Sequence, residues 1–267
     1  MIELGKEQRQ GIGNICMHSK EVLVRGAVEG TMGRVWVPEL GLSPYCLIVV
    51  GDFAYLLGMP PRGARALDLK RQIYESAGHA YLYPQNERWG QWLEERLAGQ
   101  LRTVTRYALK KDEYHFDMEK LKMYRDSIPQ GIKMKHIDEK LYHLAMKEEW
   151  SKALCENFED FHHFKLHGFG YVAVKDRKIV SGCSAYGASE GMMEIQVATR
   201  REYCRQGLAL ACSAAFLLEC LQKDIIPNWD ATNQQSVDLA EKLGYMYERE
   251  YQVYQLVEID EPDLFGW

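Results

Sequence analysis

The chain has 267 residues, of which 46% are hydrophobic and 27% charged, and its formal net charge is −5. A chain of this length and composition can bury a core and predicts one or two globular domains, which excludes a disordered, collagenous or low-complexity protein. The acidic excess argues against a nucleic-acid-binding protein, although a local basic pocket for a small anion remains open.

The cysteines and the N-terminus are typical of a cytoplasmic protein. Seven cysteines occur without a Cys-x-x-Cys pair, so we expect reduced, mostly buried thiols rather than disulfides or a metal site. Residues 1–10 are charged and lack the apolar segment of a signal peptide. The most apolar stretch, residues 208–221, is shorter than the ~20 residues of a membrane span, so we expect no membrane partner.

The N-terminal half predicts alternating strands and helices. Strands are predicted over residues 34–39, 45–50, 53–57, 79–83 and 101–109. Helices are predicted over residues 14–31, 66–76 and 86–97. A charged, helical connector over residues 110–126 leads to a Pro/Gly joint at residues 128–131. The predicted domains are therefore residues 1–127 and 128–267.

The C-terminal half predicts the element order β-α-α-β-β-β-α-β-α-β. Strands are predicted over residues 133–137, 169–175, 178–186, 192–199, 225–230 and 245–257. Helices are predicted over residues 138–146, 148–163, 206–223 and 236–243. The last seven elements repeat the order β-β-β-α-β-α-β of the N-terminal half, which predicts a mixed α/β fold with an internal duplication.

The strongest local signal spans residues 199–209, where a predicted strand passes through a basic turn into a helix. The first N–H groups of a helix are unpaired and lie at the positive end of its dipole, so they favour a phosphate group. Gly207 and Ala209 leave room for a close approach, and three arginines add positive charge. An ordinary strand-to-helix turn with basic residues is the alternative.

Residues 204–209, Cys-Arg-Gln-Gly-Leu-Ala, resemble motif A of the GCN5-related N-acetyltransferases (GNAT), [Arg/Gln]-x-x-Gly-x-[Gly/Ala], with Cys204 at the first position. Residues 233–245 resemble motif B, Asn-x-x-Ser/Ala-x-x-Leu-x-x-Lys-x-Gly-Phe/Tyr. Residues 227–233 are similar to a narrower GNAT subgroup that carries an extra N-terminal half. The resemblance implies a C-terminal GNAT fold with a mixed, mostly antiparallel sheet, behind a degenerate GNAT-like N-terminal domain.

The resemblance also implies an activity and a set of cofactor contacts. The activity is transfer of an acetyl group from acetyl-CoA to an amine, by direct attack on the thioester. The pantetheine arm would pair with the backbone of Val197, Ala198 and Thr199, and would be reached by Asn233. The pyrophosphate cradle would consist of Arg205, Gln206, Gly207, Leu208, Ala209 and Leu210.

Acid–base catalysis has one candidate residue and one gap. Glu194 lies on the strand before motif A and is the candidate general base, with a solvated strand carboxylate as the alternative. Many GNAT enzymes carry a tyrosine, the general acid, one residue after the motif B leucine. Ala240 occupies that position here, so the general acid is not identified.

The N-terminal half does not match motif A, because Pro60 and Pro61 have no N–H groups for a phosphate. We therefore expect this half to shape the acceptor cleft or to form a homodimer face. The expected acceptor is a small-molecule amine. A non-catalytic acetyl-CoA sensor or scaffold, a peptide or protein acetyltransferase, and an interaction domain that merely kept the fold remain as alternatives.

Overall fold

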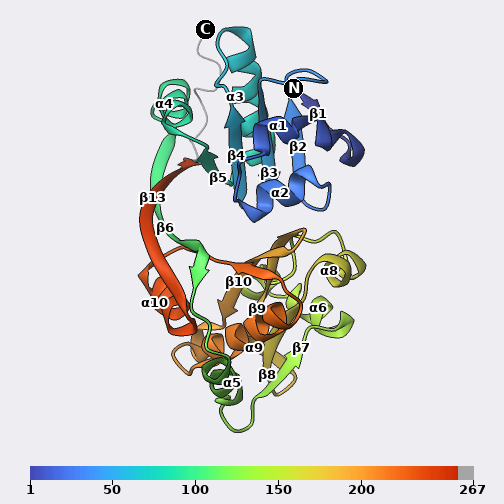
Figure 1. Ribbon diagram of the computed structural model, residues 1–267, viewed down its shortest axis with the longest axis vertical. Coiled ribbons are helices and arrows are strands. Elements are labelled where there is room, and N and C mark those ends of the chain that lie inside the picture. Colours follow the sequence, from blue (N-terminus) through green and yellow to red (C-terminus); the bar gives the residue numbers. More distant parts are fainter. Residues whose placement is uncertain (258–267) are drawn as a thin grey trace. The chain divides into compact units, whose positions relative to one another are not determined.

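The computed structural model of the protein describes residues 1–257, apart from the side chains of residues 112 and 113. The described chain forms two compact units (Figure 1). The first comprises residues 1–19, 27–105 and the described residues from Tyr251 onward, and the second comprises residues 20–26 and 106–250. Strands β6 (Leu101–Tyr114) and β13 (Tyr245–Leu256) each contribute residues to both units. The boundary expected at residues 127 and 128 therefore lies inside the second unit.

The first unit contains a sheet in the order β1-β2-β3-β4-β5-β13. Its further strands are β1 (Ile2–Glu3), β2 (Arg34–Val37), β3 (Tyr45–Val50), β4 (Phe53–Gly58) and β5 (Tyr81–Pro84). All neighbours are antiparallel except β4 and β5, which are parallel. Helices α3 (Ala64–Ala77) and α4 (Glu87–Arg96) bury Leu69, Ile73, Trp89 and Leu93 against this sheet.

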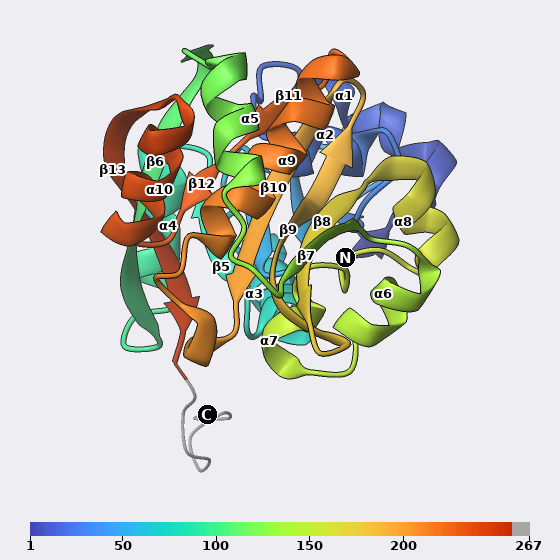
Figure 2. The same ribbon diagram turned by 90° about the horizontal axis from the view of Figure 1, so that it is seen from below.

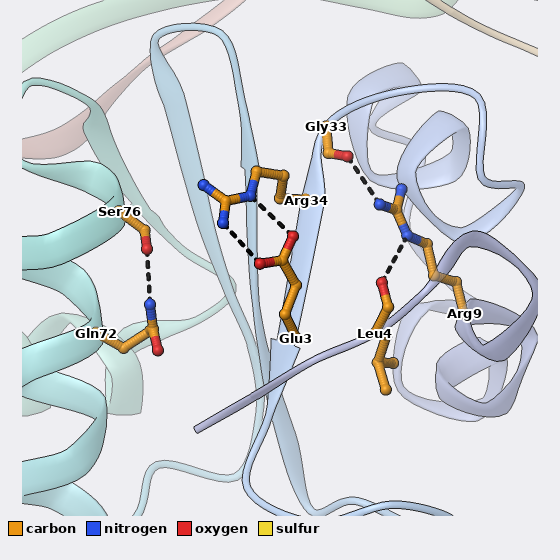
Figure 3. A network of polar contacts seen from close by, with 7 residues as sticks. All are labelled: Glu3, Leu4, Arg9, Gly33, Arg34, Gln72 and Ser76. Carbon is orange, nitrogen blue, oxygen red and sulfur yellow. Dashed lines mark hydrogen bonds and ion pairs between the residues drawn. The ribbon is translucent and has the colours of Figure 1, made fainter.

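A buried arginine holds the N-terminal segment of the first unit in place (Figure 3). Arg9, in the 3₁₀ helix η1 (Lys6–Ile12), is 4% exposed. Its guanidinium donates hydrogen bonds to the carbonyl oxygens of Met32 (2.8 Å), Gly33 (2.9 Å) and Ala27 (3.2 Å). These bonds satisfy three carbonyl groups while keeping the buried charge solvated by backbone dipoles.

The second unit contains a sheet in the order β11-β10-β9-β8-β7. Its strands are β7 (Lys133–His136), β8 (Gly170–Lys175), β9 (Lys178–Ser189), β10 (Met192–Thr199) and β11 (Ile226–Asn228). Only β10 and β11 are parallel among these neighbours. Both units therefore place one parallel strand pair at the corresponding point of the order β-β-β-α-β-α-β, as the sequence predicts for a duplication.

Helices cover both faces of the second unit's sheet. Successive β9 side chains point to opposite faces: Cys183 contacts Ser213 of α9 (Leu208–Gln222), whereas the Ser184 hydroxyl donates to the Leu154 carbonyl (2.5 Å). Helices α6 (Glu139–Ala145) and α7 (Glu149–Lys152) contact β9 as well. Figure 2 shows α5 (Met118–Asp126) beside α9, against which it packs.

Three predicted helices have different bounds in the structure. The helix expected over residues 14–31 is interrupted, and forms α1 (Gly13–Cys16) and α2 (Val22–Val28) around a turn in which Ser19 N–H donates to Cys16 O (2.9 Å). The helix expected over residues 148–163 ends early, and Asp160 caps a new helix, α8 (Phe161–His167). The connector over residues 110–126 is the end of β6 followed by α5.

All seven cysteines lie within the described chain as free thiols, and Cys204 is the exposed one. Burial raises the pKa of the Cys183 thiol, which keeps that group protonated. Among the described residues no helix combines the length and the apolar character needed to cross a membrane.

Candidate functional site

Strands β10 and β11 pair over three residues and then separate. Met192–Glu194 lie beside Ile226–Asn228, after which β10 continues to Thr199 and the chain leaving β11 enters β12 (Asp230–Ala231), which pairs with β6. The gap exposes one edge of the second half of β10. A strand edge of this kind can bind an extended ligand through its main-chain groups.

The orientation of the β10 backbone follows from one hydrogen bond. Arg200 N–H donates to Val180 O in β9 (3.0 Å). Because N–H groups alternate along a strand, those of Val197 and Thr199 point away from β9 and into the gap. The backbone of Ala198 points toward β9, where its carbonyl accepts a hydrogen bond from the Ser181 hydroxyl (3.3 Å).

Helix α9 begins beside this gap without a capping side chain. Its N-cap, Gly207, has a left-handed backbone with φ of 78°, and an added Cβ would meet nothing within 4 Å. The first main-chain bond of the helix runs from Ala211 N–H to Gly207 O (3.0 Å), so the N–H groups of Leu208, Ala209 and Leu210 have no partner within the helix. Arg205 is also left-handed, with φ of 61°. Consecutive N–H groups in such a turn form a concave anion site.

The gap and the helix start border a single cavity of about 700 Å³. Its walls come from the end of β10, the following turn, the start of α9, and helix α10 (Gln234–Leu243). Eight of the expected contact residues line it: Val197, Thr199, Arg205, Gly207, Leu208, Ala209, Leu210 and Asn233. Ala198, Gln206 and the candidate base Glu194 are not among the lining residues.

Other lining residues were not expected from the sequence. They include Tyr203, Trp229, Thr232, Ser236, Leu239 and Lys242. Four of them recur at helical spacing from Thr232 to Lys242, so the face of the motif B helix could have indicated them. Trp229 carries no such periodic signal.

The Asn233 side chain is already engaged in capping α10. Its Oδ1 accepts a hydrogen bond from Ser236 N–H (3.0 Å), and its Nδ2 donates to the Thr232 hydroxyl (3.3 Å). The oxygen therefore belongs to the helix start. Contact of the remaining amide proton with pantetheine stays a prediction.

Glu194 is buried, not a solvated strand residue. It lies at the last position of β10 that pairs with β11, and it is 7% exposed. Its side chain accepts a hydrogen bond from the side chain of its register partner, Asn228. Burial raises the pKa of Glu194 to about 7. The charge of Lys111 and the Asn228 bond lower that pKa, whereas Asp230 and Glu21 raise it.

The charges around Glu194 are largely paired with one another. Lys111 binds Glu21 (2.7 Å), and Arg106 binds Asp230 (2.7 Å). Among the described residues, Lys111 and Arg106 are therefore each paired with a carboxylate other than Glu194. Glu194 is thus a carboxyl group that can gain or lose a proton near neutral pH, as a general base requires.

The position of the missing tyrosine does not face the cavity. Ala240 is fully buried and is not among the lining residues. Tyr245 is nearby in sequence, but it is buried and its hydroxyl donates to Pro227 O (2.9 Å). Burial raises the pKa of Tyr245 well above its usual value, so this hydroxyl is a poor acid.

The corresponding strand pair of the first unit is closed. Beyond the paired residues of β4 and β5, Gln85 N–H donates to Leu56 O (3.1 Å) and the Gln85 side chain accepts from Gly58 N–H (2.9 Å). The indole N–H groups of Trp89 and Trp92 donate to Gly58 O (2.9 Å) and Pro61 O (2.8 Å). These bonds occupy the main-chain groups that the second unit leaves available.

Comparison with known proteins finds similar solved structures. A solved structure of a GCN5-related N-acetyltransferase-like protein from Streptococcus suis 89/1591 has 34% identity and a TM-score of 0.85, covering 95% of this chain and all of its own. A tandem GNAT protein from the clavulanic acid biosynthesis pathway has 12% identity and a TM-score of 0.56, covering 95% of this chain and 96% of its own, and shows the fold alone.

Sequence comparison also finds acetyltransferases. The uncharacterized N-acetyltransferase YdfB of Bacillus subtilis (strain 168) is 29% identical over 130 residues, which are 48% of this chain and 49% of that protein. The match thus spans about half the length of this curated relative. The model of the GNAT acetyltransferase family matches residues 14–254. The chain belongs to the GNAT acetyltransferase family, whose members generally use acyl-CoA.

Proposed function

We propose that the second unit transfers an acetyl group from acetyl-CoA to the amine of a small molecule, with Glu194 as the general base. The observation that carries this proposal is the buried Glu194 carboxyl, which has a pKa of about 7 and lies where β10 and β11 separate. A reacting amine must lose a proton, and ordinary alkyl amines are protonated at neutral pH. A base with a pKa near 7 is well matched to that task.

The described residues fit the cofactor along the cavity. The N–H groups of Leu208, Ala209 and Leu210, together with Arg205 and Lys242, would hold the phosphates. The β10 edge at Val197 and Thr199 would bind the pantetheine amides. An N–H group of this edge would also polarise the thioester carbonyl. When bound, the cofactor supplies an activated acyl group, so the protein's task is to position and deprotonate the amine.

Loss of the usual tyrosine supports a second candidate function, a protein that binds acetyl-CoA without turning it over. Ala240 has no ionisable group and is buried. A thiolate is nevertheless an acceptable leaving group without a strong acid, since thiols ionise at about pH 8.5. Acceptor turnover separates the two candidates: a sensor binds acetyl-CoA but acetylates none of a panel of small amines.

Calorimetric titration with acetyl-CoA and CoA is the first test. The unmodified protein should bind both, and Gly207→Asp should weaken binding at least 100-fold, since it places a carboxylate where the pyrophosphate must lie. Gly131→Asp is the matched control, because Gly131 also has a positive φ and open space around its Cβ position. Equal affinities for the two variants would place the cofactor elsewhere, and absence of binding to the unmodified protein would refute the proposal.

A further inference from the structure

Ser236 presents a hydroxyl proton to the cavity. Trp229 Nε1 donates a hydrogen bond to Ser236 Oγ (3.1 Å). An indole nitrogen can only donate, so the serine oxygen must accept, and its own proton is left for another partner. Within the described part of the chain no residue takes that proton, and Ser236 lines the cavity.

The register of the strands places this hydroxyl near the point where β10 and β11 separate. Asn228 lies beside Glu194, and Trp229 is the next residue, at the point where the strands separate. Trp229 is 4% exposed, so its indole and the serine bound to it are fixed. Gly207, at the proposed phosphate cradle, lines the same cavity, whereas Glu194 does not line it. Because the proposed base lies where β10 and β11 separate, we expect the thioester on that side of the cavity, where Ser236 is bound to Trp229.

Other hydroxyl and thiol groups that line the cavity are engaged, exposed or lie elsewhere. The Thr199 hydroxyl shares a hydrogen bond with Ser181 (2.7 Å). The Thr232 hydroxyl also accepts a hydrogen bond, from Asn233, but both of these residues are exposed, whereas Ser236 is held by the buried Trp229. Tyr203 and Cys204 belong to the turn before the phosphate cradle. Their positions favour the phosphate end of the cofactor rather than its sulfur.

We infer that the Ser236 hydroxyl, oriented by the Trp229 indole, donates a hydrogen bond to the sulfur of the departing CoA. This inference rests on the proposed acetyl transfer. Before that step Glu194 passes the ammonium proton of the amine on to solvent. In the step the neutral amine nitrogen bonds to the carbonyl carbon, the carbon–sulfur bond breaks with its electron pair staying on sulfur, and Glu194 takes the proton that the nitrogen loses in becoming an amide. Ser236 keeps its proton and stabilises the thiolate by a charge-assisted bond.

The test measures the ionisation of bound CoA and needs no acceptor. Thiolate absorbance in the ultraviolet is followed against pH for CoA bound to the full-length protein. The bound thiol should ionise at lower pH than free CoA. Ser236→Ala should reduce the thiolate-to-thiol ratio at a given pH about tenfold or more, as expected for loss of one hydrogen bond to a charged group. Ser236→Thr, which keeps a hydroxyl, should restore most of the ratio.

Two further variants separate a catalytic contact from a structural one. Ser127→Ala removes an exposed hydroxyl outside the cavity and should leave the ratio unchanged. Trp229→Phe keeps an aromatic ring but removes the indole N–H that orients the Ser236 hydroxyl, and should give an intermediate ratio. Identical titrations for the unmodified protein and Ser236→Ala, at equal CoA affinity, would overturn the inference. If Ser236→Ala lowers the thiolate-to-thiol ratio as expected but the unmodified protein acetylates no amine, the proposed function is refuted while the Ser236 contact stands.

Discussion

Replacing Glu194 by glutamine should make the second unit more stable at alkaline pH. The pKa of Glu194 is raised from 4.5 to about 7, chiefly by burial. The folded state therefore holds this proton more tightly than the unfolded state does, and the carboxyl favours folding fully below pH 4.5. That contribution is lost as pH rises through about 7, at up to about 1.4 kcal/mol per pH unit. The whole difference is about 3 kcal/mol.

Glu194→Gln removes the charge and keeps the size of the side chain. The amide oxygen can still accept the Asn228 hydrogen bond. The free energy of unfolding should therefore rise by up to about 3 kcal/mol near pH 8 and by little near pH 4. The variant should at the same time lose acetyl transfer, because it cannot accept a proton.

Urea unfolding across this pH range measures the effect. Hydrogen exchange of the amides in α9 assigns the transition to the second unit, since a buried helix exchanges through cooperative opening. Glu202→Gln is the control, because Glu202 is exposed and its variant removes a carboxylate without touching the buried site around Glu194. A Glu194→Gln stability difference that does not grow with pH would refute the assignment of a raised pKa to this carboxyl.

Three further predictions concern other parts of the molecule. Asn228→Ala should raise the pKa of Glu194, because it removes a hydrogen bond that favours the ionised carboxylate. The acid limb of the pH profile of kcat/KM should then move to higher pH by about one unit. An unmoved limb would show that the Asn228–Glu194 hydrogen bond does not affect ionisation. Glu219 raises the pKa of His136, so their stabilising contact is complete below pH 6.5 and is lost as pH rises through the raised value. His136→Asn should therefore cost up to about 1 kcal/mol near pH 6 and almost nothing near pH 9, by thermal unfolding. Arg9→Met should destabilise the first unit by about 2–4 kcal/mol, because buried carbonyl groups lose their donor; an unchanged urea midpoint for that unit would contradict this.

The helix start at Gly207, which we propose as the cofactor cradle, could be predicted from sequence because it depends on local backbone chemistry. A strand end, a left-handed glycine and a helix start lie within a few residues around Gly207, and each has a sequence signal. The orientation of Val197 and Thr199 required one more fact, the bond from Arg200 to Val180, which depends on sheet register. For the same reason the sequence alone did not show that the backbone of Ala198 points toward β9, whereas the N–H groups of Val197 and Thr199 point into the gap.

The environment of Glu194 depends on residues that are distant in sequence. Alternation along the strand predicts which β10 residues share a face with Glu194. It does not predict that Asn228, Lys111 and Glu21 lie near this carboxyl group. These contacts arise from the parallel pairing of β10 with β11 and from the course of β6. The division of β6 and β13 between two units had no local signal either, so a boundary placed by composition fell within the second unit.

The two parallel strand pairs show how one topology can either bind a ligand or be closed. In the second unit the strands separate after Glu194, and the helix that follows β10 starts with glycine and uncapped N–H groups. In the first unit Gln85, Trp89 and Trp92 form hydrogen bonds with the main chain after β4. Each such bond would have to be broken before a pantetheine arm could enter, while the prolines after β4 offer no N–H in return. The difference between the two strand pairs therefore lies in a few side chains at the strand ends, and we expect the first unit not to hold a second cofactor.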